Sequence, residues 1–209
     1  MEEFWETHFK KEGSSWGYEP ADSALYASNV FRQKGYSSVL IPGIGYGRNV
    51  KPFLETGMNV SGIEISVSAV NLLKEVCPMV NVIHGSVLDM PFDNAVYEGI
   101  YCYALIHLFN FQQRHHVISA CHQQLAWDGT MIFSVISPES ETMKAGKKIG
   151  RNRCLMPNGL KVFFYDDTDI KKEFTDFGLN EIINIDEPVK FMKDEPAMKF
   201  KMIICTKLK

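Results

Sequence analysis

A glycine-rich turn between two apolar runs constrains the fold of this 209-residue chain more than any other feature. The first run leads into Gly43, Gly45 and Gly47, and the second run, 59–63, ends in a carboxylate at Glu64. Glycine is needed where a backbone turns tightly or approaches a ligand closely. A carboxylate at a strand tip can accept hydrogen bonds from a ribose diol. Together these features predict a nucleoside-binding βαβ unit.

The spacing of the glycines distinguishes two classes of ligand. The dinucleotide fingerprint G-x-G-x-x-G places its third glycine where a helix packs closely beside a bound pyrophosphate. In this chain the third residue after Gly45 is Arg48, and the third glycine comes one position earlier, at Gly47. The spacing therefore disfavours an NAD-dependent oxidoreductase, which stays the weaker alternative. A tight turn without any ligand is the purely structural alternative.

Strand and helix patterns alternate over the first two thirds of the chain. This alternation predicts right-handed βαβ crossovers and a mainly parallel sheet. The predicted strands are Ser37–Ile41, Asn59–Ile63, Val80–His84, Val96–Cys102 and Thr130–Ile136, and the predicted helices are Gly47–Thr56, Ser66–Val76 and Gln112–Ala126, with a turn at Asp128-Gly129.

The last third of the chain has a different pattern. Residues 137–161 are predicted to form a polar, basic loop, and 167–177 a helix. Two further strands, 179–185 and 198–206, follow each other without a helix between them, which predicts an antiparallel hairpin. The expected fold is an α/β, Rossmann-like three-layer αβα sandwich with a seven-stranded, mainly parallel sheet. One domain, 1–209, comprises an N-terminal cap segment (1–36), a cofactor-binding core (37–136) and an acceptor-side loop with the C-terminal hairpin (137–209).

The composition of the chain limits its protein class, its location and its partners. Apolar residues make up 45% and charged residues 22% of the chain, as in ordinary globular proteins. The chain contains no run of about eighteen apolar residues, so no transmembrane helix is predicted. The acidic, aromatic N-terminus does not resemble a signal peptide. The five scattered cysteines suggest reduced thiols in the cytoplasm. A net charge of −3 argues against a nucleic-acid partner, and no metal site is predicted from the histidines and cysteine of 115–122.

The segment Val39-Leu40-Ile41-Pro42-Gly43-Ile44-Gly45-Tyr46-Gly47 resembles motif I of the class I S-adenosylmethionine (SAM)-dependent methyltransferases. The resemblance runs from about residue 37 to the C-terminal hairpin, and it points to the tellurite-resistance and thiopurine methyltransferase-like branch. It implies that Gly43, Ile44 and Gly45 lie along the amino-acid part of SAM. The chain departs from the family at Ile41, where an Asp or Glu usually helps to hold the SAM ammonium.

The resemblance also assigns the residues around the adenosyl group. Glu64 matches the acidic residue that binds the ribose hydroxyls, and Ile65 would pack on the adenine face. Ser86 stands where the family has an Asp that receives the adenine amino group, and Val87 could offer its backbone N–H to the ring. Asp89, three residues later, is a rival for the role of that Asp.

The segment 99–108 matches the fourth strand of the family and the floor of its active site. Backbone carbonyls of Cys102 and Tyr103 are candidate partners for the SAM ammonium. His107 is a candidate general base, because an imidazole titrates near neutral pH; a structural histidine is the alternative. Tyr103 and His107 are the candidate catalytic residues.

Near the N-terminus, Phe4-Trp5-Glu6 and Ser15-Trp16-Gly17-Tyr18 resemble the start of the same branch, in which an N-terminal segment closes over SAM. An indole facing a sulfonium is a favourable cation–π arrangement. Trp16 is therefore a candidate cofactor contact, and the alternative is that it anchors a helix on the core.

Two further segments lie on the acceptor side. Residues 144–153 carry five positive charges and no negative one, so they could attract an anionic substrate or form a solvated loop. Residues 163–165, Phe-Phe-Tyr, could line the acceptor pocket or belong to the core.

Methyl transfer from SAM is a direct displacement at carbon, in which positioning supplies about 7–11 kcal/mol of the barrier reduction. A base is needed only for a weakly acidic hydroxyl or a protonated amine. The expected activity is methylation of a small molecule, which could be anionic, and SAM is the expected cofactor. A catalytically inactive SAM-binding or regulatory protein is the main alternative. The sequence does not predict the oligomeric state.

Overall fold

The computed structural model describes residues 1–92, 94–188 and 196–209. In chain order, the elements are α1 (Glu2–Glu12), α2 (Asp22–Gln33), β1 (Ser38–Pro42), α3 (Lys51–Glu55), β2 (Asn59–Glu64), α4 (Val67–Val76), β3 (Asn81–His84), η1 (Val87–Asp89), β4 (Tyr97–Tyr103), η2 (Ile106–Leu108), α5 (Phe111–Gln123), β5 (Leu125–Ile136), η3 (Glu141–Ala145), β6 (Lys147–Gly150), β7 (Arg153–Leu155), β8 (Lys161–Phe163), α6 (Asp167–Phe174), η4 (Thr175–Phe177), β9 (Leu179–Glu187) and β10 (Met198–Thr206).

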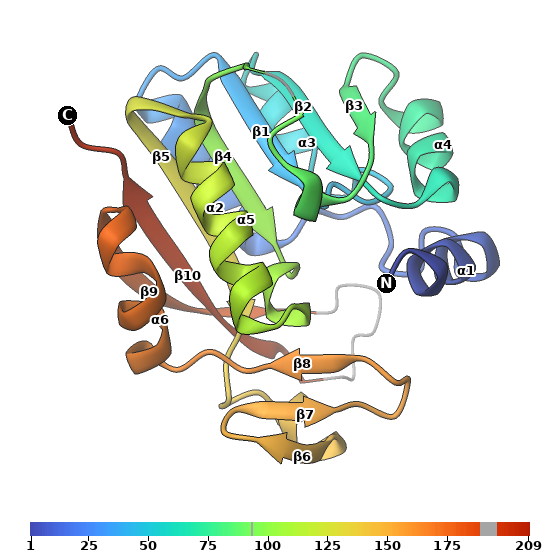
Figure 1. The fold of residues 1–209 in the computed structure, drawn as a ribbon. Coiled ribbons are helices and arrows are strands. Elements are labelled where there is room, and N and C mark those ends of the chain that lie inside the picture. The colour runs from blue at the N-terminus through green and yellow to red at the C-terminus, as the bar shows by residue number, and fades with distance from the viewer. Residues whose placement is uncertain (93, 189–195) are drawn as a thin grey trace.

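The main sheet has seven strands in the order β3-β2-β1-β4-β5-β10-β9 (Figure 1). Strands β1 to β5 pair in parallel, whereas β10 is antiparallel to both of its neighbours. The predicted fold class and the predicted C-terminal hairpin are thereby confirmed.

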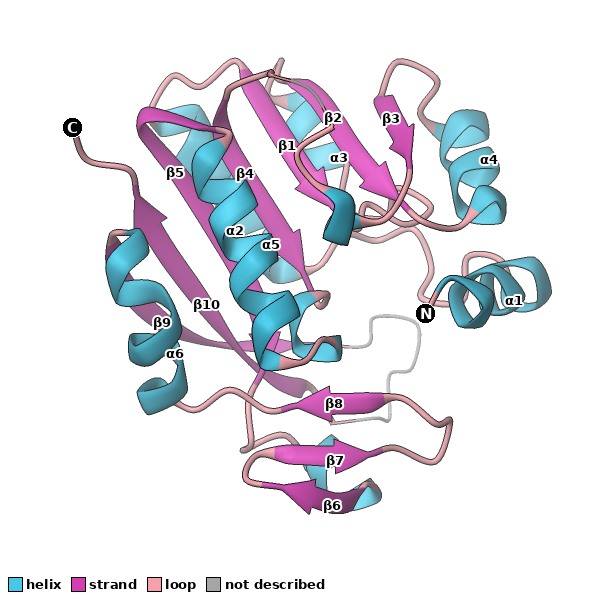
Figure 2. Ribbon diagram, viewed as in Figure 1, coloured by secondary structure: helices cyan, strands magenta, loops and turns pink. Residues whose placement is uncertain are grey.

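Helices cover both faces of this sheet. Figure 2 shows α5 and α6 in front of the sheet and α2 behind it. Alternate residues of β1 face the two sides, since Leu40 packs in the core under α5 whereas Val39 and Ile41 pack in the core under α2, α3 and α4. The short apolar strands are therefore buried on both faces, as expected of a parallel sheet.

Two helices are shorter than predicted: the first begins later than Gly47, and the helix predicted to end at Ala126 ends at Gln123. The predicted helix 47–56 is reduced to α3, because the glycine turn extends as far as Val50 before the chain becomes helical. Asp128 has the left-handed φ (63°) of the predicted turn, but strand β5 already begins at Leu125. The pairing of β4 with β5 shifts register at this point, so the turn is accommodated inside a strand.

The prediction of a loop over 137–161 was wrong for most of its length. After η3, the strands β6, β7 and β8 form a separate three-stranded antiparallel sheet, called here the small sheet. It lies beside one end of the main sheet (Figure 1). Its strands are three or four residues long and β6 is exposed throughout. The sequence therefore contains little of the alternation of apolar and polar residues that predicts a strand.

Among the three glycines of the turn, Gly47 is the one that its neighbours restrict most tightly. Its φ is +88°, and an added Cβ would overlap the Leu73 side chain of α4. Gly57 has a similar φ of +82° but nothing within 4 Å of that position. We expect Gly47→Ala to lower the free energy of unfolding by about 1 kcal/mol more than Gly57→Ala, because only the first adds overpacking to backbone strain. Urea denaturation of both variants measures the difference, and equal losses would contradict it.

Candidate active site

A cavity of about 560 Å³ opens at the carboxyl ends of β1, β2 and β4. Ligands of open α/β sheets bind at this edge, and the volume lies in the range of small-molecule sites. Its wall has two parts. The glycine-loop half includes Trp16, Gly43, Ile44, Gly45, Glu64, Ile65, Ser86 and Val87, and the small-sheet half includes His107, Leu108, Ile136, Met156, Leu160, Val162, Met198 and Phe200.

Glu64 fastens the glycine loop to the next helix. Its Oε2 accepts a hydrogen bond from the Gly45 N–H at 2.9 Å, and its Oε1 accepts one from the Ser66 N–H at 2.9 Å. Burial raises the pKa of the Glu64 carboxyl, and the two backbone donors oppose that rise. Each carboxylate oxygen keeps a second lone pair, so the group can still receive ligand hydroxyls from the cavity.

Gly45 is the loop glycine that faces open space. Its φ is +60°, and an added Cβ would meet nothing nearer than a ring carbon of Phe9 at 3.9 Å. Gly43 and Ile44 both donate their N–H groups to the Ile63 carbonyl, at 2.9 and 3.1 Å. The loop is therefore held from outside and leaves its inner surface for a ligand.

On the next side of the wall, Ser86 begins the short helix η1. Its Oγ accepts a hydrogen bond from the Leu88 N–H at 3.2 Å. The structure brings Ile65, Ser86 and Val87 together with Glu64 in the cavity wall, whereas Asp89 is not among the lining residues.

At the end of β4, the two predicted residues Cys102 and Tyr103 have different surroundings. Cys102 is buried and does not line the cavity, whereas Tyr103 does. Burial raises the pKa of the Tyr103 hydroxyl, and nearby Glu187 adds to the rise, so Tyr103 keeps its proton. The following residue, Ala104, lines the cavity with a left-handed φ of 51°, a rare conformation for alanine that can mark a functional turn.

His107 lies in the small-sheet half of the wall and is almost fully buried. Its Nδ1 accepts a hydrogen bond from the Ile136 N–H at 3.4 Å. Burial lowers its pKa to about 3, so the ring is neutral at physiological pH. A neutral ring whose Nδ1 lone pair is engaged is a poor general base.

Helix α1 closes the cavity on the glycine-loop side. Trp5, Phe9 and Trp16 line the cavity and contact one another, with ring centroids 5.8 to 6.3 Å apart. The predicted cavity position of Trp16 and its alternative role in packing against the helix are therefore compatible.

Glu6 attaches α1 to the first turn of α4. Its carboxylate accepts hydrogen bonds from the Ser66 hydroxyl (2.7 Å), the Ser68 N–H (3.0 Å) and the Ser68 hydroxyl (2.7 Å). These bonds, that of the Ser68 N–H first, lower the pKa of Glu6 to about 2. Because this lies below the ordinary value of 4.5, the attachment is complete above pH 4.5 and is lost as the pH falls through 2.

We expect Glu6→Gln to release α1 at neutral pH, because the neutral amide is a weaker acceptor for these donors. Tryptophan fluorescence in a Trp127→Phe background reports on Trp5 and Trp16. At neutral pH, Glu6→Gln should show the spectrum of the protein with α1 released, which the parent shows only in acid. Glu3→Gln on the same helix is the matched control and should behave like the parent. A Glu6→Gln variant with the parental spectrum and pH response would contradict the attachment.

Other predicted features lie outside the cavity wall. Ile41 packs in the core under α2, so its side chain does not face the cavity. None of the cations of 144–153 is among the lining residues; Lys144 pairs with Glu141, and Arg151 pairs with Asp166. Within the described part of the wall, Arg48 is the one Lys or Arg. The aromatic residues of 163–165 do not line the cavity either.

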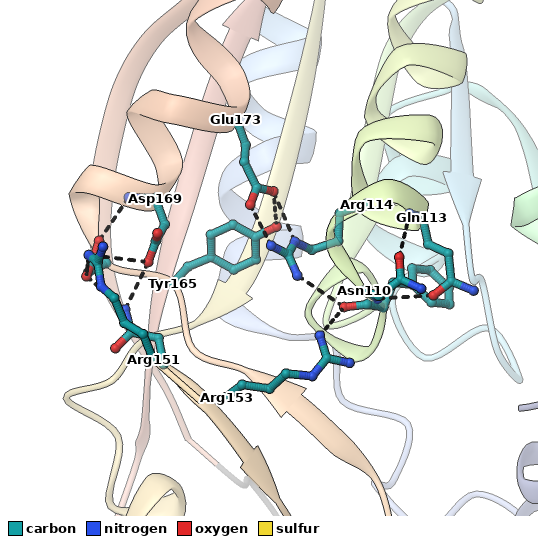
Figure 3. A network of polar contacts seen from close by, with 11 residues as sticks. Asn110, Gln113, Arg114, Arg151, Arg153, Tyr165, Asp169 and Glu173 are labelled. Carbon is teal, nitrogen blue, oxygen red and sulfur yellow. Dashed lines mark hydrogen bonds and ion pairs between the residues drawn. The ribbon is translucent and has the colours of Figure 1, made fainter. Parts of the chain in front are cut away.

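A buried polar network fixes the small sheet to the core (Figure 3). Arg114 of α5 donates two hydrogen bonds to Glu173 of α6, at 2.6 and 3.0 Å, and a third to the Phe109 carbonyl at 3.1 Å. The Tyr165 hydroxyl donates to the same Glu173 carboxylate at 2.8 Å. Arg153 of β7 reaches the Phe109 carbonyl from the other side, at 3.2 Å. The residues of 163–165 thus belong to the support of the site.

Sequence reasoning missed most of the small-sheet half and the cation of the site. Arg48 donates from Nε to the Glu19 carbonyl at 2.8 Å, and its guanidinium lies 6.0 Å from the centre of the Tyr103 ring. Ile136, Val162 and Phe200 come from three distant segments, and no local motif marks them as neighbours.

Comparison with known proteins agrees with this geometry. A family described as "Methyltransferase domain" matches residues 39–129. This part of the chain carries a methyltransferase domain. The predicted resemblance to the class I SAM-dependent methyltransferases and the predicted enzyme class are thereby confirmed. No curated protein matches the sequence.

Among solved structures, the chain is similar to 1,6-didemethyltoxoflavin-N1-methyltransferase from Burkholderia thailandensis, with 15% identity over 100% of this chain and 87% of that one, and a TM-score of 0.74. Magnesium protoporphyrin IX methyltransferase from Synechocystis PCC 6803 shows 15% identity over 99% of both chains, with a TM-score of 0.72. TehB from Haemophilus influenzae shows 14% identity over 98% and 67%, with a TM-score of 0.69. At these identities the likeness establishes the fold.

Two negative findings apply to residues 1–92, 94–188 and 196–209. No helix there is both long and apolar enough to cross a membrane. In the same ranges, no three His, Cys, Asp or Glu side chains are grouped so that they could hold a metal ion.

Proposed function

We propose that this methyltransferase transfers the methyl group of SAM to a small-molecule acceptor by in-line displacement. The observation that carries the proposal is the cavity in which a glycine loop and a buried Glu64 lie at the carboxyl edge of the sheet, opposite an apolar wall. Two of the similar solved structures contain bound S-adenosylhomocysteine (SAH), which supports the choice of cofactor.

The residues present fit SAM. Gly45 leaves room that a Cβ would fill, and Glu64 offers lone pairs for a ribose diol. Ile65, Ser86 and Val87 would surround the adenine; Val87 begins η1, where backbone N–H groups lack partners inside the helix. When bound, SAM supplies an activated methyl group on a positively charged sulfur.

The ends of the amino-acid part need charged or polar partners. Arg48 would hold the carboxylate, as the cation of the described wall. The ammonium would be received by backbone carbonyls near Tyr103 rather than by a side chain at position 41, since Ile41 belongs to the core. Trp16 would lie beside the sulfonium, where a cation–π contact is worth about 0.5–2 kcal/mol.

The small-sheet half would position the acceptor. Its side chains are mainly apolar, so it excludes water and favours a compact organic molecule over a macromolecule. In this division of labour, 1–36 is the cap, 37–136 binds the cofactor and 137–209 completes the acceptor side of one domain. The five free cysteines fit a cytoplasmic location.

The test of catalysis is turnover. Purified protein is incubated with methyl-labelled SAM and a panel of small acceptors that offer O, N, S and metalloid nucleophiles. The proposal predicts acceptor-dependent formation of SAH and of a labelled product. If SAM binds but no acceptor is methylated, the alternative of a catalytically inactive SAM-binding protein gains the support.

A further inference from the structure

The proton of the His107 ring has a defined position. The Ile136 N–H is a donor without a lone pair, so Nδ1, which receives it at 3.4 Å, carries the lone pair of the neutral ring. The ring proton therefore lies on Nε2. Nε2 has no hydrogen-bond partner among the residues that the structure describes. Among the described residues, Ser134 Oγ is the one polar side-chain atom that is fully buried without a hydrogen-bond partner. Nε2 has no partner among these residues either, so it is not fully buried, and it faces the cavity that His107 lines.

The surroundings of this N–H are apolar. The Phe200 ring meets the imidazole edge to face, at 6.2 Å and 73°, and Leu108, Ile136 and Val162 line the same half of the cavity. Burial alone lowers the pKa of His107, and no charged group contributes to the shift. Over the pH range of ordinary assays the ring is therefore a neutral hydrogen-bond donor in a nonpolar wall.

Two other polar side chains of this region already use an acceptor atom within the protein. Asn158 Oδ1 accepts from the Leu160 N–H, and Thr142 Oγ1 accepts from the Ser140 hydroxyl, each at 3.2 Å. Tyr103 keeps its proton, since burial raises its pKa. Glu64, the one carboxylate among the described lining residues, belongs to the glycine-loop half. The small-sheet half thus offers a donor at Nε2 but no base and no charge.

We infer that His107 is a positioning residue whose Nε2–H donates a hydrogen bond to the methyl acceptor, and that the acceptor is an uncharged, mainly apolar molecule with a hydrogen-bond-accepting atom beside its nucleophile. This inference rests on the proposed function. A lone pair of the acceptor forms the new bond to carbon, the electron pair of the broken carbon–sulfur bond stays on sulfur, and no proton passes to His107. A neutral nucleophile becomes cationic in this step and gives any surplus proton to solvent.

Two isosteric probes test the match. Quinoline and naphthalene have the same shape, and only quinoline has a ring nitrogen that accepts a hydrogen bond. Calorimetric titration of the SAH-saturated protein should show quinoline binding about fivefold to tenfold more tightly, the worth of one hydrogen bond. Equal affinities, or tighter binding of the anion 2-naphthoate than of quinoline, would overturn the inference.

Two variants assign the preference to the ring. His107→Phe should bind both probes equally, whereas His107→Gln, which retains an amide donor, should keep part of the preference for quinoline. A preference that survives unchanged in His107→Phe would overturn the role of His107.

The unmodified protein provides an independent readout. Long-range ¹H–¹⁵N spectra of ¹⁵N-histidine-labelled protein distinguish the two neutral tautomers and the cation. We expect His107 to remain in the Nε2–H form from pH 8 to pH 5; an Nδ1–H form or a titration near pH 6.5 would overturn the inference. Failure of SAH to bind at the start would instead refute the proposed function, so the two failures are distinguishable.

Discussion

Glu64→Ala is expected to weaken SAM binding by about 1.5–3 kcal/mol, or about 10- to 150-fold in Kd. The variant removes the carboxylate proposed to receive the ribose hydroxyls, and it also frees the Gly45 and Ser66 N–H groups, which Glu64 holds at 2.9 Å. Calorimetric titration with SAM measures the loss directly.

Glu98→Ala is the matched control for this experiment. Glu98 also holds backbone N–H groups through its carboxylate, those of Ser37 at 2.6 Å and Ser38 at 3.2 Å, but it lies at the opposite edge of the sheet. It should bind SAM with the parental Kd. If Glu64→Ala does the same, the ribose lies elsewhere and the assignment of the glycine-loop half is wrong.

Arg114→Ala is expected to lower the free energy of unfolding by about 3–5 kcal/mol, because it leaves the Glu173 carboxylate buried without its cation. The Arg114 and Glu173 side chains are 4% and 3% exposed, so water cannot replace the lost partner. The guanidinium also lies 4.0 Å from the centre of the Phe163 ring, a contact that the variant loses as well. Urea denaturation measures the loss.

An exposed ion pair provides the comparison for Arg114. Lys144 pairs with Glu141 at 2.7 Å, but these side chains are 76% and 64% exposed. Lys144→Ala should therefore cost less than about 1 kcal/mol. If Arg114→Ala proves too unstable to purify, Tyr165→Phe removes one hydrogen bond to Glu173 and should cost about 1 kcal/mol. A loss below 1 kcal/mol for Arg114→Ala itself would contradict the structural role of the network.

The parts of the fold that the sequence predicted are those with local signals. The strand before the glycine turn contains a continuous apolar run, and Gly43, Gly45 and Gly47 all adopt the positive φ that their residue type permits. Glu64 lies at the end of β2 because the length of the crossover from the glycine turn brings it there. Ser66 caps α4 by accepting a hydrogen bond from the Ala69 N–H, as its position before an apolar helix predicted.

The parts that the sequence did not predict depend on distant contacts. The small sheet is held through Arg153, which donates to the Phe109 carbonyl 44 residues away, and its short strands have little pattern of their own. The basic residues of 144–153 could attract an anionic substrate according to the sequence, yet none of them lines the cavity. The tautomer of His107 follows from the backbone N–H of Ile136, 29 residues away, which no motif around His107 could indicate.

The central claim is that this cavity binds the adenosyl group of SAM. Calorimetric titration of the purified protein with SAM, SAH and NAD in parallel tests it most directly. The account predicts one molecule of SAM or SAH bound per chain and no binding of NAD. Binding of NAD alone, or of none of the three ligands, would contradict it.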